Sequence, residues 1–423
     1  MTEKIAKPQL RFAGFDDTWE QRKLGDVADL VGGGTPSTQN PEYWDGDIDW
    51  YAPAEIADQI YVKTSQRKIT EQGYDNSSAK LLPPGTVLFT SRAGIGKTAI
   101  LARKGCTNQG FQSIVPHKNE LDTYFIFSRT EELKRYGELV GAGSTFVEVS
   151  GKQMAAMDLM LPSTIREQQM IGVFFKHLDN LITLHQRKYD KLTNVKKSML
   201  EKMFPKNGSN VPEIRFKGFS DTWEQRKFDE VFDCTIPNNT LSRAELNYES
   251  GSVRNIHYGD ILIKYGSVVD VQNDEIPFAT GKSSDDFKGA LLQDGDIIIA
   301  DTAEDETTGK ACEIGNSQGL DVVSGLHTMV CRPRNKMALG YLGYYLNSDA
   351  YHHQLLPLMQ GIKVLSLSRT NVQKTMVCYP KSKAEQQLIA DCFRNLDNLI
   401  TLHQRELEKL KNLKKACLEK MFV

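Results

Sequence analysis

The chain contains two copies of one unit, and this internal repeat constrains its fold more than any other feature. The segment Pro8–Val27 recurs as Pro212–Val231 with 13 of 20 positions identical, at an offset of 204 residues. The segment Glu167–Phe204 recurs as Glu385–Phe422 with 25 of 38 positions identical, at an offset of 218 residues. The blocks between these matches resemble each other only faintly. The sequence therefore predicts one fold built twice, with a shared frame and two divergent blocks.

The two longer matched segments are expected to form long α-helices. Apolar residues recur in both at spacings of three and four, and no Pro or Gly interrupts residues 173–204. The identical run LDNLITLHQR in both copies favours packing of the two helices on each other as a coiled coil. The two histidines of this run are expected to set the register of the helices rather than to bind a metal. The residues predicted at the helix seam are Leu178, Leu181, His185, Leu396, Leu399 and His403.

The connection between the helices predicts their direction. The block 232–380 joins the end of the first helix to the start of the second, and antiparallel helices bring the two ends of this block together. By the repeat, the block 28–162 belongs at the other end of the helices. Met1 and Val423 both align with Pro205, so the chain is expected to resemble a circle of two repeats opened at one linker. The predicted result is a dumbbell with pseudo-two-fold symmetry.

Both intervening blocks have an α/β pattern. Short runs rich in β-branched and aromatic residues alternate with Gly, Asn and Pro turns and with short helical stretches. The predicted fold class is therefore α/β, with two such domains joined by two long antiparallel helices. The predicted division is 1–162 for the first domain, 163–210 for the central helix and its linker, 211–381 for the second domain and 382–423 for the C-terminal helix.

Composition places the chain among globular proteins. Its 40% hydrophobic and 25% charged residues are ordinary values for that class. We find no run of 18 apolar residues and no charged-then-apolar leader, so neither a membrane span nor a secretory signal is expected. The seven cysteines show no C-x-x-C spacing and fit reduced thiols in a cytoplasmic protein better than a zinc site or a disulfide framework.

Charge is unevenly distributed along the chain, although the net charge is only −2. Residues 163–210 hold 9 basic and 4 acidic residues, and residues 382–423 hold 8 and 6. By contrast, residues 1–160 hold 18 basic and 21 acidic residues, and residues 211–381 hold 17 and 23. A DNA-binding protein usually carries a basic face that neutralises phosphates. In this chain such a face must be local, or a partner must supply it.

No catalytic or cofactor motif is complete. The stretch Ser91–Ile100 (SRAGIGKTAI) resembles a phosphate-binding loop but has Ser91 where the motif needs glycine, which favours a turn with a lysine. The cluster Gly32–Gly34 is read as a turn, because it lacks the rest of a dinucleotide-binding motif. There is no metal-ligand spacing and no Asn/Asp-Pro-Pro-Tyr/Phe tetrapeptide of the kind found in amino-methyltransferases. We therefore expect no catalytic residue, no cofactor and no metal.

Three motifs of the first block give the chain a family resemblance. They are GGGTPSTQNPEYWDGDIDWY (Gly32–Tyr51), SRAGIGKTA and NQGFQSIVP (Asn108–Pro116). Together with the two EQQ…LDNLITLHQR helices, they resemble the specificity subunit of type I restriction-modification systems, over essentially the whole chain. The second block departs from this pattern, since it has TIPNNTLSR (Thr235–Arg243) in place of the GGTPS…YW stretch.

The resemblance implies a function in DNA recognition. Each block would be a target recognition domain that reads one half of a split, asymmetric site in double-stranded DNA, and the helices would set the gap. Two methyltransferase subunits would dock on the frame, and restriction (nuclease-translocase) subunits would join for cleavage. Trp19 and Trp223, which lie in a motif shared by both copies, would be frame or docking residues rather than base-stacking residues.

Sequence-specific reading of DNA needs polar and basic side chains presented on loops. For each single residue, a solvated surface or turn role is the alternative to a contact with DNA. The candidates in the first block are Thr35, Ser37, Arg92, Lys97, Gln109, Gln112, Ser144 and Thr145. The candidates in the second block are Asn238, Arg254, Lys264, Lys310, His327, Lys363 and Arg369.

Two other classes of function remain as alternatives. The first is a DNA methyltransferase or nuclease that acts alone, against which the missing motifs count. The second is a coiled-coil scaffold that does not bind DNA.

Overall fold

The computed structural model describes residues 7–56, 59–92, 94–142, 148–206 and 208–423. It divides into two compact units, which we call unit 1 (Met1–Gln186 with Arg405–Val423) and unit 2 (Arg187–Gln404). The boundaries cut both long helices, and they do so at the same repeat position, because 186 and 404 differ by the repeat offset of 218. Each unit therefore contains one intervening block together with one end of each long helix. The expected division, by contrast, treated the helices as separate segments.

The elements of unit 1 between its N-terminal segment and the first long helix are short. They are β1 (Glu20–Lys23), α1 (Leu24–Val27), β2 (Ala28–Gly32), β3 (Trp44–Tyr51), β4 (Tyr61–Val62), β5 (Arg67–Ile69), α2 (Glu71–Asp75), β6 (Val87–Phe89), β7 (Thr98–Leu101), β8 (Cys106–Thr107), β9 (Gln112–Pro116), α3 (Thr123–Ser128), α4 (Thr130–Gly141), α5 (Gly151–Ala155) and β10 (Asp158–Leu161). Several helices begin at side-chain caps; for example, Asp122 accepts a hydrogen bond from the Phe125 N–H at the start of α3.

Unit 2 repeats this order with additions. Its elements are β11 (Glu224–Lys227), α7 (Phe228–Val231), β12 (Phe232–Asp233), β13 (Leu246–Asn247), β14 (Val253–Ile256), α8 (Tyr258–Ile263), β15 (Val268–Asp270), β16 (Phe278–Ala279), β17 (Ile297–Ala300), β18 (Thr302–Ala303), β19 (Ala311–Gly315), β20 (Asp321–Ser324), β21 (Thr328–Pro333), α9 (Tyr341–Leu346), α10 (Asp349–His352), β22 (Leu365–Ser366), α11 (Arg369–Val372) and β23 (Met376–Tyr379).

The main sheets of the two units have the same topology. The strand order is β2-β9-β6-β7-β4 in unit 1 and β12-β21-β17-β19-β15 in unit 2. In both sheets only the last pair is parallel. The central strands β6 and β17 are buried along their whole length, which is why both consist of apolar residues. The prediction that the two divergent blocks share one α/β fold is confirmed.

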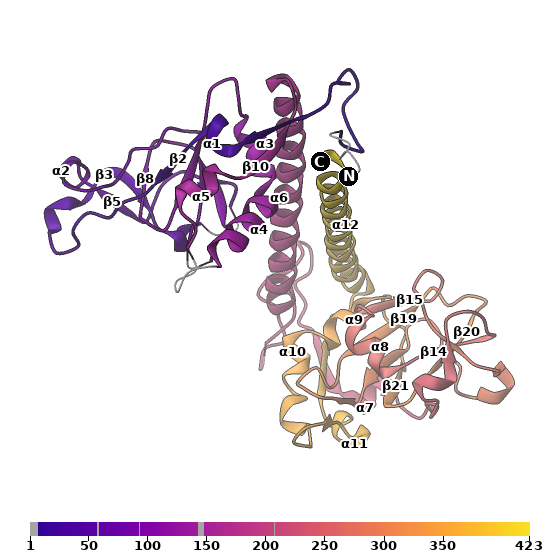
Figure 1. Ribbon diagram of the computed structural model, residues 1–423. Coiled ribbons are helices and arrows are strands. Elements are labelled where there is room, and N and C mark those ends of the chain that lie inside the picture. The colour runs from indigo at the N-terminus through magenta and orange to yellow at the C-terminus, as the bar shows by residue number, and fades with distance from the viewer. Residues whose placement is uncertain (1–6, 57–58, 93, 143–147, 207) are drawn as a thin grey trace. The chain divides into compact units, whose positions relative to one another are not determined.

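The smaller sheets differ between the units. Unit 1 has three strands in the order β5-β3-β8, and unit 2 has four in the order β13-β16-β14-β20. In Figure 1 the small sheet of unit 1 lies on the side of that unit away from α6 (Ile165–Lys202), whereas α3 lies against α6, where the Tyr124 hydroxyl donates to the Asp179 carboxylate. The two blocks therefore differ not only in sequence but also in the number of strands in their small sheets.

The shared frame repeats residue by residue. In unit 1, Trp19 is 3% exposed and packs against Phe125 and Phe422. In unit 2, Trp223 is equally buried and packs against Phe204. Because both indoles are buried, the prediction that they belong to the frame rather than stack on bases is confirmed.

The two long helices, α6 and α12 (Lys383–Met421), run antiparallel in each unit. In unit 1, Phe175 of α6 stacks on Phe422, with ring centroids 5.7 Å apart. In unit 2, Phe204, which lies two residues after the end of α6, stacks on Phe393 of α12, with centroids 5.8 Å apart. Residue numbers thus rise along one helix as they fall along the other. This confirms the predicted antiparallel direction.

The seam prediction needs a correction at two positions. Leu178 is 6% exposed, and Leu396 packs against the core of unit 2. Leu181 and Leu399, however, are each 43% exposed and do not lie at a buried seam. A step of three residues turns an α-helix by about 300°, so positions 181 and 399 lie about 60° from positions 178 and 396, at the edge of the buried face. His185 and His403 are half-buried.

Candidate nucleic-acid interface

Three loops of unit 1 meet at the carboxyl end of β6. The Thr90 N–H donates to the Lys97 carbonyl at 3.0 Å, which closes the loop between β6 and β7. The Ser91 N–H donates to the Gly110 carbonyl at 2.8 Å, which adds the loop before β9. The Val149 N–H donates to the Ser91 carbonyl at 3.0 Å, which adds the segment that leads into α5. We call this meeting point the loop junction of unit 1.

Unit 2 builds the same junction with the same backbone bonds at the end of β17. The Ala300 N–H donates to the Lys310 carbonyl at 2.9 Å. The Asp301 N–H donates to the His327 carbonyl at 3.1 Å, and the Leu367 N–H donates to the Asp301 carbonyl at 2.8 Å. Each hydrogen bond has its counterpart in unit 1. The loops of both units therefore start from one common backbone frame.

The junction of unit 1 gathers four of the eight candidates predicted in the first block. The Thr35 hydroxyl donates to the Gln109 side chain. The Arg92 guanidinium lies 3.8 Å from the Glu148 carboxylate, and their backbones form an isolated β-bridge. Lys97 is exposed within the same loop as Arg92. The structure thus brings together side chains from three separate segments.

The remaining candidates of the first block are less central. Gln112 is half-buried on β9, and Ser37 is exposed, with its carbonyl accepting from the Trp44 indole. Ser144 and Thr145 lie outside the described residues.

The junction of unit 2 gathers four of its seven candidates. His327 is exposed, has a φ of +55°, and places its ring nitrogen 3.6 Å from the Asp301 carboxylate. The Asn238 side chain donates to the Gly325 carbonyl at 3.2 Å, two residues from His327. Lys363 and Arg369, on either side of β22, are both exposed.

Three predicted cations of unit 2 bind the protein's own groups instead. The Lys310 ammonium donates to the carbonyls of Leu262 and Tyr265 at 3.0 and 3.1 Å, and burial lowers its pKa. The Arg254 guanidinium donates to the Val271 carbonyl at 2.8 Å. The Lys264 ammonium donates to the Glu275 carboxylate at 2.7 Å. Each of the three cations therefore has a structural role.

One exposed group at this junction was not predicted. Ile362, between Gly361 and Lys363, is 100% exposed. Ile362 is apolar, whereas the candidates predicted from the sequence are polar or basic residues. The available signal was the repeat itself, because GSTF (143–146) aligns with GIKV (361–364) and the two differ in chemistry at the second and third positions.

An exposed apolar stripe runs along each long helix outside these junctions. Six of its members lie at matching repeat positions, 170 with 388, 181 with 399 and 184 with 402, whereas Val173 aligns with Asp391; between 36% and 51% of each apolar side chain is exposed. The stripe of unit 1 consists of Met170, Val173, Leu181 and Leu184, and that of unit 2 consists of Leu388, Leu399 and Leu402. A face that recurs in this way is suited to binding the same partner twice.

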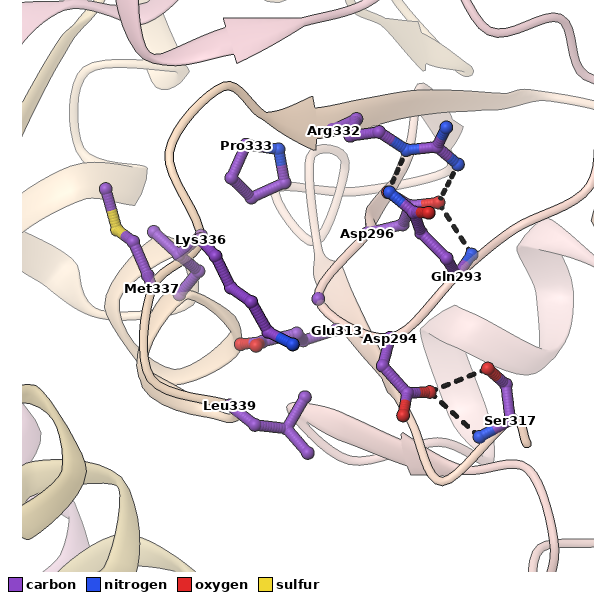
Figure 2. A pocket seen from close by; sticks show the side chains of 12 residues that line it. Gln293, Asp294, Asp296, Glu313, Ser317, Arg332, Pro333, Lys336, Met337 and Leu339 are labelled. Atoms are coloured by element: carbon purple, nitrogen blue, oxygen red, sulfur yellow. Dashed lines mark hydrogen bonds and ion pairs between the residues drawn. The ribbon is translucent and has the colours of Figure 1, made fainter. Parts of the chain in front are cut away.

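A pocket of about 470 Å³ in unit 2 contains several polar side chains (Figure 2). Asp296 forms an ion pair with Arg332 at 2.6 Å, and Asp294 accepts hydrogen bonds from the backbone N–H and the hydroxyl of Ser317. Burial raises the pKa of Glu313 to about 7. These side chains are engaged with one another and with the backbone, which gives the pocket a structural role.

Glu313 has a specific structural task. Its carboxylate accepts hydrogen bonds from the N–H groups of Gly340 and Gly343 at 2.8 and 2.9 Å. Gly340 precedes α9 with a φ of +95° and offers no side-chain cap. Glu313 from β19 therefore caps α9, whereas α3 in unit 1 is capped by its own Asp122.

Two negative findings concern the part of the chain that the structure describes. It contains no group of three or more His, Cys, Asp or Glu side chains placed to hold a metal ion. Within the same residues, no helix combines the length and the apolar character needed to cross a membrane.

Comparison with known proteins extends over both repeats. The family model for the type I restriction modification DNA specificity domain matches residues 16–194 and 220–412. The chain is 30% identical over 289 residues to the specificity subunit of the type I restriction enzyme MjaIX of Methanocaldococcus jannaschii, a match that covers 66% of this chain and 61% of that protein. It is 21% identical over 412 residues to the MjaVIII specificity subunit of the same organism, which covers 94% and 91%.

A solved structure shows the same fold. The S subunit of a type I restriction-modification system from M. genitalium superposes with a TM-score of 0.57 and 15% identity, covering 99% of each chain. The family model by itself spans both repeats, from the shared N-terminal motif of each to well inside each long helix. The chain therefore belongs to the family of type I restriction-modification DNA specificity proteins.

Proposed function

We propose that this chain is the DNA specificity subunit of a type I restriction-modification complex and that each loop junction reads one half of a split DNA site. The proposal is supported by one observation: the two loop junctions have equivalent backbone hydrogen bonds but carry different side chains. Arg92 and Glu148 face each other across a β-bridge in unit 1. The equivalent pair in unit 2 is Thr302 and Ser366. A constant frame that carries different polar groups is what two readers of different sequences need.

The chemistry of the junctions suits the major groove of DNA. Bases are distinguished there by their pattern of hydrogen-bond donors and acceptors, which guanidinium, amide and imidazole groups can match. Unit 1 presents Arg92, Lys97 and Gln109, and unit 2 presents His327 and Arg369. Since both blocks are acidic in total, their affinity for phosphates must be low, and partner subunits would complete the binding.

We propose further that the apolar stripes are docking sites for two methyltransferase subunits. Leu181 and Leu184 of α6 recur as Leu399 and Leu402 of α12, so one partner surface fits both stripes. Two copies of one partner on the two repeats follow from this internal symmetry. Restriction subunits would join the complex in which DNA is cleaved.

The proposal is tested on the complex reconstituted with its methyltransferase subunits. The methylated motif is determined first, and binding is then measured on duplexes that carry changes in one half-site at a time. Arg92→Ala should weaken discrimination in only one half-site, and His327→Ala in only the other. As matched controls, Arg103→Ala and Lys288→Ala change exposed cations elsewhere in the same units and should leave the motif unchanged.

The same preparation separates the alternatives. Methyl transfer from S-adenosylmethionine by the purified chain without partners would favour an enzyme that acts alone. A reconstituted complex that binds all duplexes equally would favour a scaffold without a role in reading DNA.

A further inference from the structure

We propose that Ile362 is a specificity-determining residue of unit 2, which contacts the C5-methyl group of a thymine in the DNA half-site while Lys363 contacts the backbone phosphates. This inference rests on the proposed function and assigns one base type to one side chain. It concerns the loop 361–365, which leaves the junction of unit 2 between the 3-10 turn Leu356–Leu358 and β22.

The base of this loop is held firmly by backbone hydrogen bonds. The Gln360 N–H donates to the Ser366 carbonyl at 3.0 Å, and the Ser366 N–H donates to the Gln360 carbonyl at 2.8 Å. Leu365 and Ser366 pair with β18, and the Leu367 N–H donates to the Asp301 carbonyl at 2.8 Å. The loop is therefore tied to the same junction that presents His327.

The turn at the start of the loop requires a glycine at position 361. Gly361 has a φ of +127°, and a Cβ atom at this position would lie 1.9 Å from the Val364 carbonyl oxygen. No other residue fits without rearrangement of the turn. A tight turn thus displays the two residues that follow Gly361, with Ile362 100% exposed and Lys363 exposed beside it.

Exposure alone would not assign a function, because single apolar side chains are common on protein surfaces. The comparison between the repeats adds the second observation. Gly361 and Ser368 recur as Gly143 and Ser150, so the two residues that bracket this segment are shared. At the positions of Ile362 and Lys363, the first copy has Ser144 and Thr145. The bracketing residues are shared, whereas the tip is polar in the first copy and apolar and basic in the second, as expected where two readers recognise different bases.

The chemistry of DNA then selects the target. Among the base edges in the major groove, thymine presents the one apolar group, its C5-methyl. An isoleucine next to a lysine can bury that methyl group while the ammonium binds a phosphate. The Ile362 side chain has no hydrogen-bond donor or acceptor with which it could recognise guanine, cytosine or adenine.

The test uses the complex reconstituted with its methyltransferase subunits and duplexes in which each thymine of one half-site in turn is replaced by uracil, which lacks the methyl group. We expect one uracil substitution in the half-site read by unit 2 to weaken binding about fourfold, the effect of one lost methyl contact. Ile362→Ala should cause a similar loss on the thymine duplex, and the uracil substitution should then have no further effect. Lys363→Ala should weaken binding to all sequences and lower the salt dependence by about one counterion.

Ile362 is fully exposed, so its substitution does not threaten the fold. Val364→Ala, which changes the half-exposed apolar residue of the same loop, is the matched control and should retain the response to uracil. The inference is overturned if the Ile362→Ala complex keeps the wild-type ratio between thymine and uracil duplexes, or if the half-site of unit 2 contains no A·T pair. If Arg92→Ala and His327→Ala also leave both half-sites unchanged, the proposed function fails as well; if they alter their half-sites, only the inference about Ile362 fails.

Discussion

The Lys414 ammonium of α12 lies 2.6 Å from the Asp179 carboxylate of α6, and this ion pair is the repeat image of another. In unit 2 the Lys196 ammonium of α6 lies 2.5 Å from the Asp397 carboxylate of α12. Both carboxylates also accept a hydrogen bond from a tyrosine of the adjoining block at 2.8 Å, Asp179 from Tyr124 and Asp397 from Tyr344. In each unit, one carboxylate thus joins the two helices to the block that reads DNA in our proposal.

The first prediction concerns these carboxylates. Asp179→Asn should lower the free energy of unfolding of unit 1 by about 1–2 kcal/mol. The substitution removes the negative charge of an ion pair in which Asp179 is largely buried and Lys414 is partly exposed. Hydrogen exchange of the amides of α3 and the end of α12 measures the effect. Asp397→Asn should have the corresponding effect in unit 2, and Glu419→Gln, an exposed acid on α12, should have none. Equal exchange in Asp179→Asn and wild type would contradict the prediction.

The second prediction concerns pH and Glu313. Burial raises its folded-state pKa to about 7, above the ordinary value of 4.5, so the folded state retains a proton that the unfolded state loses. The contribution of Glu313 to stability is therefore greatest at low pH, and it falls by about 2–3 kcal/mol as the pH rises through this range. Denaturant unfolding monitored in unit 2 should show this fall in the wild type and a flatter dependence in Glu313→Gln.

The matched control for this experiment is Glu306→Gln, which changes an exposed carboxylate of the same block. It should retain the wild-type pH dependence. A Glu313→Gln variant with an unchanged slope would show that the pKa of Glu313 is not raised in the folded protein.

The third prediction follows from the two separate junctions. Replacement of residues 28–162 by the block of a relative should change one half of the methylated motif and leave the other half intact. Mapping of methylated adenines in cells that carry the exchanged gene gives the result directly. A motif in which both halves change together would argue against two independent readers.

The fourth prediction concerns the circular arrangement. The Leu10 N–H donates to the Lys420 carbonyl at 2.9 Å, and in the other repeat the Ile214 N–H donates to the Lys202 carbonyl at 2.9 Å. A short stretch of chain connects Lys202 to Ile214, whereas Lys420 and Leu10 lie near opposite ends of the chain and are not connected in this way. A variant with joined termini, reopened between Lys206 and Asn210, should therefore fold and support methylation. Insoluble protein from several such permutants would speak against the arrangement.

The fifth prediction is that the length of the two long helices sets the number of base pairs between the two half-sites of the methylated motif. The ion pairs join residues 179 and 196 of α6 to residues 414 and 397 of α12. Insertion of four residues after both Lys191 and Lys409 lengthens each helix between the pairs and retains both of them. At about 1.5 Å per helical residue and about 3.4 Å per base pair, the gap in the methylated motif should widen by roughly one or two base pairs.

A single insertion after Lys191 serves as the comparison for this experiment, because it lengthens one helix only and disturbs the pairing of the other. It should reduce methylation more strongly than the double insertion. Full activity of the double insertion at the original spacing would show that the helices do not measure the distance.

The sequence by itself determined the frame of this protein. The matched segments and the two long helices follow from the repeat and from the apolar spacing, and the antiparallel direction follows from the block that connects the helices; all of these can be recognised in the sequence without knowledge of side-chain packing. That Trp19 and Trp223 are frame or docking residues rather than base-stacking residues could be predicted because both copies share them. The sequence identified Thr35, Arg92 and Gln109 as polar loop residues but did not show that they lie at one junction.

The tertiary structure decided which side chains face solvent. Lys97 and Lys310 occupy equivalent positions after a glycine, yet Lys97 is exposed and Lys310 binds two carbonyls near α8. Periodicity suggested a seam position for Leu181, but the rotation of the helix leaves it exposed. The cap that Glu313 provides for α9 joins residues 27 positions apart in the chain. Such outcomes depend on the packing of distant segments, for which a local pattern of residues carries no information.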